Sequence, residues 1–178
     1  MHMEENIEVE IKSKVEDFER IEKILKSLNA VFLGELEERD IYFNHPMRDF
    51  KLTDEALRIR NGREFTYKGP KVDEDTKSRL EFTVKIENGE NMRLILEKLG
   101  FKAVAEVRKK RRNYKIGDVI ISLDSLPQLG NFVEIECFGP YTSSRKKVLE
   151  LAEKLGLKNF ERRSYLELLL EKSGSWND

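Results

Sequence analysis

Charged residues occupy every second position in several parts of the sequence. Glu8, Glu10 and Lys12 alternate with apolar residues near the start, and Glu134 and Glu136 repeat the acidic part of this pattern near the end. Successive side chains of a β-strand point to opposite faces, so each group would line one face of a strand. Two carboxylates beside an ammonium group could form a wall of a metal-and-phosphate site, although a single strand of this kind more often faces water.

Basic residues follow the same spacing in the middle of the chain. Arg58 and Arg60 share a face of one predicted strand, and Lys68 lies on the next strand, just before a Gly-Pro pair. Arg79 shares a face with Glu81 on a further strand. These strands therefore carry cations at positions that could face a common ligand.

The unbroken basic run from Arg108 to Arg112 leaves the orientation of its strand open. Either Lys109 and Arg111 lie on the charged face of the sheet, or a shift by one residue places their neighbours there instead. We prefer Lys109 and Arg111. The next predicted strand ends in Asp124, which adds another carboxylate.

The charged faces could have two environments, water beside an open sheet or the lumen of a closed barrel. We expect a lumen lined by so many cations to hold a polyanion, because unpaired buried charge is very costly. Its carboxylates would repel one another unless they bound a divalent cation, and oxygen ligands favour Mg²⁺ or Mn²⁺. Cations beside a carboxylate-held metal are the usual apparatus for binding a triphosphate and transferring a phosphoryl group.

The hydrophobic pattern predicts short strands, mostly in hairpin order, with helices between them. The predicted strands are 7–12, 30–44, 56–60, 64–68, 78–87, 104–116, 119–124 and 131–138, and the predicted helices are 15–28, 89–99 and 142–155. Residues 163–171 fit a helix or a strand. The pattern indicates an α+β fold in which an antiparallel sheet, closed or open, carries helices on its outside.

Composition limits the classes of function. The 178 residues have a formal net charge of -1, which argues against a dedicated nucleic-acid-binding protein. Cys137 is the single cysteine, so neither an internal disulfide nor a cysteine-based metal site is expected. No apolar run is long enough to span a bilayer, and we expect a cytoplasmic protein.

With these residues laid out, the sequence resembles the CYTH superfamily of triphosphate tunnel enzymes, which includes class IV adenylyl cyclases, thiamine triphosphatases and inorganic triphosphatases. The matching motifs are Glu8-x-Glu10-x-Lys12, Arg58-x-Arg60, Lys68 before Gly-Pro, Arg79-x-Glu81, Lys109-x-Arg111-x-x-Tyr114, Leu123-Asp124 and Glu134-x-Glu136. Each motif alone is weak, but their order and spacing are specific. The segment Ser164 to Leu169 resembles the class IV cyclase branch.

The resemblance implies one domain over residues 1–172, folded as an eight-stranded antiparallel β-barrel, with a loose tail at 173–178. It implies triphosphate contacts from Arg58, Arg60, Lys68, Arg79, Lys109 and Arg111. It implies Mg²⁺ or Mn²⁺ held by carboxylates among Glu8, Glu10, Glu81, Asp124, Glu134 and Glu136. Lys12, with Glu10, would be catalytic, orienting or activating the attacking group.

Three functions remain open from the sequence. The chain could be a cyclase that converts ATP to cyclic AMP and pyrophosphate, a metal-dependent triphosphatase acting on inorganic or thiamine triphosphate, or a non-catalytic polyphosphate-binding module. The repeated carboxylates count against the third. The polar segment 71–77 reads as a solvated loop or a lid over the tunnel mouth. A homodimer is compatible with the resemblance, and neither nucleic acid nor a membrane is expected as a partner.

Overall fold

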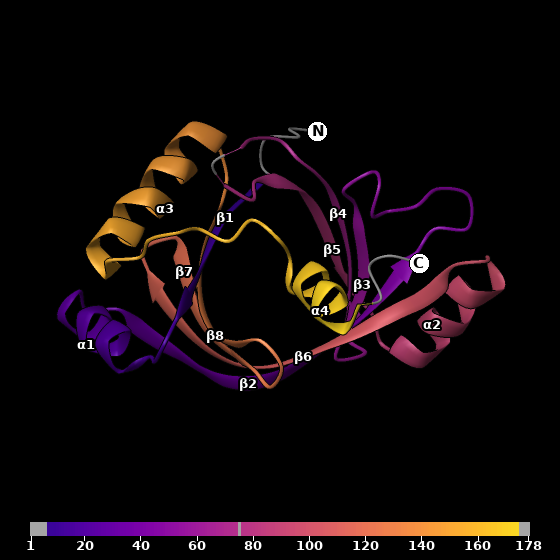
Figure 1. The fold of residues 1–178 in the computed structure, drawn as a ribbon, viewed down its shortest axis with the longest axis horizontal. Helices are drawn as coiled ribbons and strands as arrows, with labels where there is room; N and C mark the ends of the chain where they lie inside the picture. The colour runs from indigo at the N-terminus through magenta and orange to yellow at the C-terminus, as the bar shows by residue number, and fades with distance from the viewer. Residues whose placement is uncertain (1–6, 75, 175–178) are drawn as a thin grey trace.

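The computed structural model describes residues 7–74 and 76–174, and within them eight antiparallel strands form a closed barrel (Figure 1). The strands are β1 (Ile7–Val15), β2 (Val31–Asn44), β3 (Ala56–Arg60), β4 (Glu64–Lys71), β5 (Arg79–Lys85), β6 (Lys102–Ile116), β7 (Val119–Leu126) and β8 (Gly130–Phe138). Their order around the barrel is β1-β5-β4-β3-β2-β6-β7-β8. The predicted α+β fold, with the sheet closed, is confirmed.

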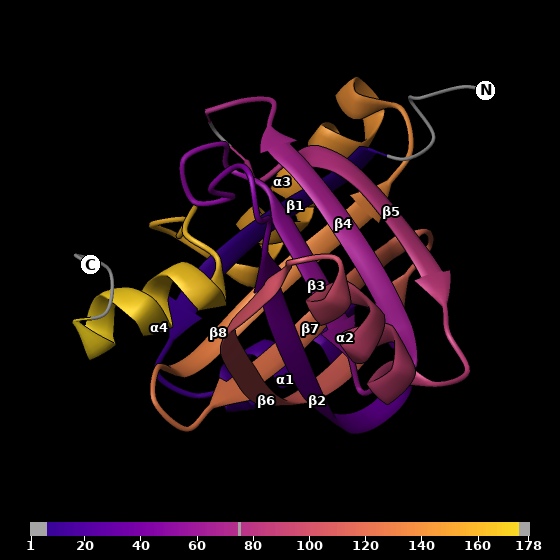
Figure 2. The ribbon, with the colours of Figure 1, turned by 90° about the vertical axis from the view of Figure 1, so that its right-hand side faces the viewer.

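Helices cover the outside and one mouth of this barrel. They are α1 (Glu19–Ser27), α2 (Gly89–Lys98), α3 (Tyr141–Leu155) and α4 (Tyr165–Ser173). Figures 1 and 2 show α1 and α3 on one side of the barrel and α2 on the opposite side, while α4 lies across the opening. In the described ranges, no helix combines the length and apolarity needed to cross a bilayer.

The apolar faces of the strands point outward, beneath the helices. Val9 and Ile11 of β1 pack in one cluster with Val148 and Leu155 of α3, and all four side chains are almost completely buried. Because neighbours along a strand face opposite ways, this packing turns Glu8, Glu10 and Lys12 into the lumen. The hydrophobic core therefore lies between barrel and helices, and the charged faces line the interior.

The barrel is closed unevenly. β1 pairs with β8 along nearly its whole length, from Glu8 opposite Phe138 to Val15 opposite Asn131. Its pairing with β5, within the described residues, is limited to Ile7 opposite Leu80 and Glu8 opposite Arg79. The pairing of β1 with β5 is thus much shorter than its pairing with β8.

Several predicted boundaries are wrong by a few residues. β1 continues to Val15, so the first helix begins only at Glu19. β4 runs past the Gly-Pro pair to Lys71, because an irregularity in its pairing with β5 accommodates the proline. The helix predicted to begin at residue 142 begins at Tyr141.

The end of the chain also differs from the prediction in part. Residues 165–173 are helical, which decides between the helix and the strand expected there. Ser173, assigned to a loose tail, is the last residue of α4. The rest of that predicted tail, from 175, lies outside the described residues, and the predicted single domain stays a prediction.

Candidate functional site

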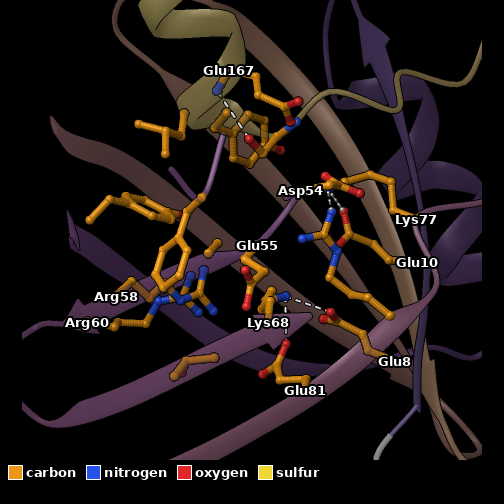
Figure 3. Close-up of a pocket in the computed structure, with 18 of the residues that line it drawn as sticks. Glu8, Glu10, Asp54, Glu55, Arg58, Arg60, Lys68, Lys77, Glu81 and Glu167 are labelled. Atoms are coloured by element: carbon orange, nitrogen blue, oxygen red, sulfur yellow. Dashed lines mark hydrogen bonds and ion pairs between the residues drawn. The ribbon is translucent and has the colours of Figure 1, made fainter. Parts of the chain in front are cut away.

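A cavity of about 520 Å³ occupies the lumen and continues toward α4. Inward-facing residues of strands from both halves of the chain line it, together with the loop before β3 and the start of α4. Figure 3 shows Arg58, Arg60 and Lys68 approaching it from one side and Glu10 and Lys77 from the other. Most of the alternating charges of the sequence therefore line a single space, whereas Lys12 and Asp124 are buried behind its wall and do not line it.

Asp40 joins the two arginines of β3. Arg60 donates from Nε and Nη2 to the two carboxylate oxygens of Asp40 at 2.7 and 2.8 Å, and Arg58 Nη1 lies 3.2 Å from Oδ2. Although burial opposes ionisation, these guanidinium groups hold the pKa of Asp40 well below its usual range. Glu38, two residues earlier on the same face, lies 2.9 Å from Arg60 and 3.1 Å from Lys109.

Arg111 is the centre of a second cluster. Its Nε and Nη2 donate to the two oxygens of Asp124 at 2.6 and 2.5 Å, and Nη2 also contacts Glu134. Burial opposes ionisation of Glu134, yet Arg111 holds the pKa of that carboxyl well below its usual range. Arg111 and Lys109 are buried, whereas Lys110 points to solvent. The preferred orientation of the basic run is confirmed.

Lys68 lies between two of the predicted metal ligands. Its Nζ is 2.6 Å from Glu8 and 2.6 Å from Glu81. Burial raises the pKa of Glu8 well above its usual range, and nearby carboxylates, including Glu81 and Glu10, add to the shift although Lys68 opposes it. The surroundings of Glu8 therefore disfavour its ionised form.

Lys77 is a functional candidate that the sequence analysis missed. The prediction of a solvated loop at 71–77 is wrong at its end, where Lys77 is 7% exposed and its Nζ donates to Glu10 at 2.6 Å. The Lys77 backbone N–H also donates to the Glu10 carbonyl. Lys77 therefore belongs to the lumen.

Lys12 is completely buried beside this pair. Its Nζ donates to the Arg163 carbonyl at 2.5 Å and lies 4.2 Å from the ring centroid of Tyr165. Burial and the neighbouring Lys77 lower the pKa of Lys12 to about 7. The Tyr165 hydroxyl in turn donates to Asp124 at 2.9 Å, so α4 holds two lumen residues in place.

The two remaining candidates, Arg79 and Glu136, also line the cavity. Arg79 Nη2 is 3.5 Å from Asp54, a residue of the loop before β3. Glu136 lines the cavity directly opposite Glu10 in the β1–β8 register. Burial raises the pKa of Glu136, and Glu10 adds to the shift although Arg111 opposes it.

The predicted metal ligands fit a divalent ion by their chemistry, but their side chains do not converge on one point. Glu8, Glu10 and Glu136 present only oxygen ligands, and their mutual repulsion would be relieved by a divalent cation. Within residues 7–74 and 76–174, however, no three acidic, histidine or cysteine side chains converge on one point. Most of these carboxylates contact a lysine or an arginine instead.

The premise that the lumen cations would be unpaired is wrong, and the polyanion expected in the lumen stays a prediction. Lys68, Lys77 and Arg111 each have a carboxylate partner within the lumen, so their burial is compensated without a ligand. One buried donor nitrogen is an exception. The buried Nε of Arg58 has no hydrogen-bond partner among the described residues, and Arg58 lines the cavity.

Replacing Asp40 by asparagine should lower stability in a pH-dependent way. The folded pKa of Asp40 is depressed, so its stabilisation is present above the unfolded value of about 3.9 and is lost as pH falls through the folded value. We expect Asp40→Asn to lower the free energy of unfolding by about 2–4 kcal/mol at pH 7. Urea unfolding from pH 7 to pH 2 should show this difference shrinking in acid.

Glu37→Gln is the matched control, because Glu37 is exposed on the same strand. That variant should stay within about 0.5 kcal/mol of the native protein. A constant Asp40→Asn deficit over the whole pH range would contradict the assignment of the effect to the Asp40 charge.

Comparison with known proteins gives consistent matches over nearly the whole chain. A family model described as CYTH domain matches residues 6–165. A Methanocaldococcus jannaschii protein, provisionally named an adenylate cyclase, is 46% identical over 171 residues, covering 91% of this chain and 98% of that protein. The adenylate cyclase CyaB of Aeromonas hydrophila is 29% identical over 181 residues, covering 94% of this chain and 91% of that protein.

Solved structures agree with these matches. A Pyrococcus horikoshii protein superposes with a TM-score of 0.84 at 43% identity, covering 93% of this chain and 99% of that chain. A second protein from the same organism has a TM-score of 0.77 at 30% identity, covering 90% of this chain and 98% of that chain.

Proposed function

The chain belongs to the CYTH domain family, and from that premise we propose that it is a metal-dependent phosphoryl-transfer enzyme that binds triphosphates in the lumen of its barrel. The observation that carries the proposal is the convergence of basic and acidic side chains from opposite walls on one cavity. A pure anion-binding module would have no need of so many carboxylates among its cations.

The basic residues supply the phosphate contacts in this proposal. Those of the predicted set are Arg58, Arg60, Lys68, Arg79, Lys109 and Arg111, and the geometry adds Lys77. The Nε of Arg58, which has no partner among the described residues, is one donor that would give up no carboxylate on binding phosphate. The others exchange a carboxylate partner for a phosphate oxygen, which keeps their buried charge compensated.

The near balance of charge in the lumen favours a triphosphate that is accompanied by a divalent cation. Glu8, Glu10 and Glu136 would hold Mg²⁺ or Mn²⁺, with Glu81, Asp124 and Glu134 close by as further carboxylates. Such an ion, when bound, would offset charge on the phosphate oxygens. Lys12, whose lowered pKa allows a neutral amine near neutral pH, would orient the attacking hydroxyl or accept its proton.

Adenylyl cyclase activity is the first candidate reaction, because two relatives that match over nearly the whole chain carry that name. In that reaction the ribose 3′-hydroxyl of ATP attacks the α-phosphorus, and pyrophosphate leaves. In the alternative, a triphosphatase, water attacks the terminal phosphorus. Both use the same phosphate-binding residues and differ in which phosphorus lies in line with the nucleophile.

Product analysis of the purified protein separates the candidates. ATP, thiamine triphosphate and inorganic triphosphate would be offered in parallel with Mg²⁺ or Mn²⁺, and products followed by ³¹P NMR and chromatography. Cyclic AMP with pyrophosphate would establish the cyclase, whereas phosphate release without cyclic AMP would make the protein a triphosphatase. Absence of any turnover or triphosphate binding would refute the proposed function.

A further inference from the structure

One strand of the barrel carries two carboxylates that do not reach the cavity. Glu38 and Asp40 of β2 are only 5% and 2% exposed. Neither lines the cavity, whereas Arg58, Arg60 and Lys109 do. Figure 3 shows the side chains of Arg58 and Arg60 together at the cavity wall. We call Glu38 and Asp40 the rear carboxylates, because they contact residues of this wall from behind.

The order of the strands explains this arrangement. β2 lies between β3 and β6, and both neighbours carry cations that line the cavity. Asp40 lies directly opposite Arg60 in the register with β3, and Glu38 lies directly opposite Lys109 in the register with β6. The inward face of β2 is therefore acidic and is flanked on both sides by the basic faces of its neighbours.

Glu38 contacts cations of both neighbouring strands. Its Oε2 is 2.9 Å from Arg60 Nη2 and 3.1 Å from Lys109 Nζ, and Arg111 Nε lies 4.0 Å away. Although burial opposes ionisation, these three cations hold the pKa of Glu38 below its usual range. Among the ion pairs of the described residues, Glu38 therefore contacts only cations that the proposed function assigns to phosphate.

These contacts have opposite consequences for an empty and for a filled lumen. Without a ligand, the rear carboxylates compensate buried cations and so stabilise the fold. When a triphosphate is bound, the same cations have a second anionic partner, and the fixed negative charge behind them repels the phosphates. Glu8 and Glu136 could offset such repulsion by holding a divalent cation on the cavity surface, but the rear carboxylates do not line that surface.

We propose that Glu38 and Asp40 are internal counter-anions, which hold the phosphate-binding cations in place in the empty lumen and limit the affinity of that lumen for triphosphate. This inference rests on the proposed function and deepens it, because it divides the carboxylates of the lumen by role. Those on the cavity surface assist binding through a metal, whereas those behind the surface weaken binding. The limited affinity allows a multiply charged product to leave.

Glu38→Gln tests the proposal, because glutamine has nearly the shape of glutamate but carries no charge. Binding of inorganic triphosphate with Mg²⁺ would be measured by isothermal titration calorimetry, at a temperature below every melting transition. Melting temperatures would be measured without triphosphate. We expect Glu38→Gln to bind triphosphate about tenfold more tightly than the native protein. Its melting temperature without triphosphate should be lower by roughly 5–10 °C.

Three further variants define the source of the effect. Asp40→Asn removes the other rear carboxylate and should also tighten binding, which keeps the proposal testable if Glu38→Gln does not fold. Glu38→Asp keeps the charge, so its affinity should stay within about threefold of the native value. Glu37→Gln is the matched control, since it removes an exposed charge from the same strand and should change neither the affinity nor the melting temperature.

The sign of the affinity change decides between the possible roles. Unchanged affinity in Glu38→Gln and Asp40→Asn, with lowered melting temperatures, would show a purely structural role and overturn the inference. Weaker binding in these variants would show that the rear carboxylates position the cations for phosphate, which would also overturn it. Either result would leave the proposed function standing. Absence of triphosphate binding by the native protein would overturn both.

Discussion

Arg111→Met should be the most damaging single change in the lumen, lowering the free energy of unfolding by roughly 3–5 kcal/mol. The substitution removes the cation that contacts Asp124 and Glu134, and both carboxylates would stay buried without their principal partner. Affinity for inorganic triphosphate should fall about 10- to 100-fold with the loss of charged hydrogen bonds. Urea unfolding and ligand-induced stabilisation would measure the two effects.

Two further variants make this result interpretable. Arg111→Lys keeps the charge but not the two-point contact with Asp124, so it should fold and still lose part of the affinity. Arg108→Met is the matched control, because Arg108 lies on the same strand, is exposed and contacts only Glu106 among the ion pairs of the described residues. Equal losses of stability and affinity in Arg108→Met and Arg111→Met would contradict the central position of Arg111.

Lys12→Met should reduce turnover by roughly 10²- to 10⁴-fold while leaving triphosphate affinity within a few-fold of the native value. Methionine fills similar space but has no amine to orient or deprotonate the attacking hydroxyl. Lys12 donates a hydrogen bond to the Arg163 carbonyl, just before α4, and faces Tyr165 at the start of α4, so these contacts rather than phosphate set its position. Steady-state turnover and binding, measured separately, check this split between kcat and affinity.

Lys14→Met provides the control for Lys12. Lys14 follows two residues later on β1 and is exposed, so its loss should leave turnover unchanged. Native turnover in Lys12→Met, with normal binding, would remove Lys12 from the catalytic group. A parallel loss of binding and turnover would show that Lys12 contributes to substrate binding instead.

The lumen could be predicted largely because strand alternation is a local property. Once Val9 and Ile11 are assigned to the core, Glu8, Glu10 and Lys12 must face the other way, and the same argument orients Arg58 and Arg60. Glu38 could have been found by this rule, since it shares a face with Asp40 and lies on the strand that pairs with β3. Residues 37–40 are all charged, so the assignment would have to come from Ile41 and Phe43, which pack in the core on the opposite face.

The positions of Lys77 and Val104 could not be predicted in this way. Lys77 reaches the lumen from an irregular segment, and a contact between its backbone and that of Glu10 fixes its place. Val104 faces the cavity because the pairing of two distant strands slips by one residue, which strict alternation does not reveal. Sequence periodicity predicts which side chains share a face of a regular strand. These two positions depend instead on an irregular segment and on a β-bulge.

The paired charges of the lumen also determine how this barrel responds to heat. Taking Asp40, Arg111 and Glu134 out of water opposes folding, and this penalty falls as temperature rises because hydration of charged groups becomes less favourable. The apolar packing beneath the outer helices gains no comparable advantage on warming. The desolvation penalty of the lumen charges is therefore largest at low temperature and smallest at high temperature. This change favours the closed barrel as the temperature rises.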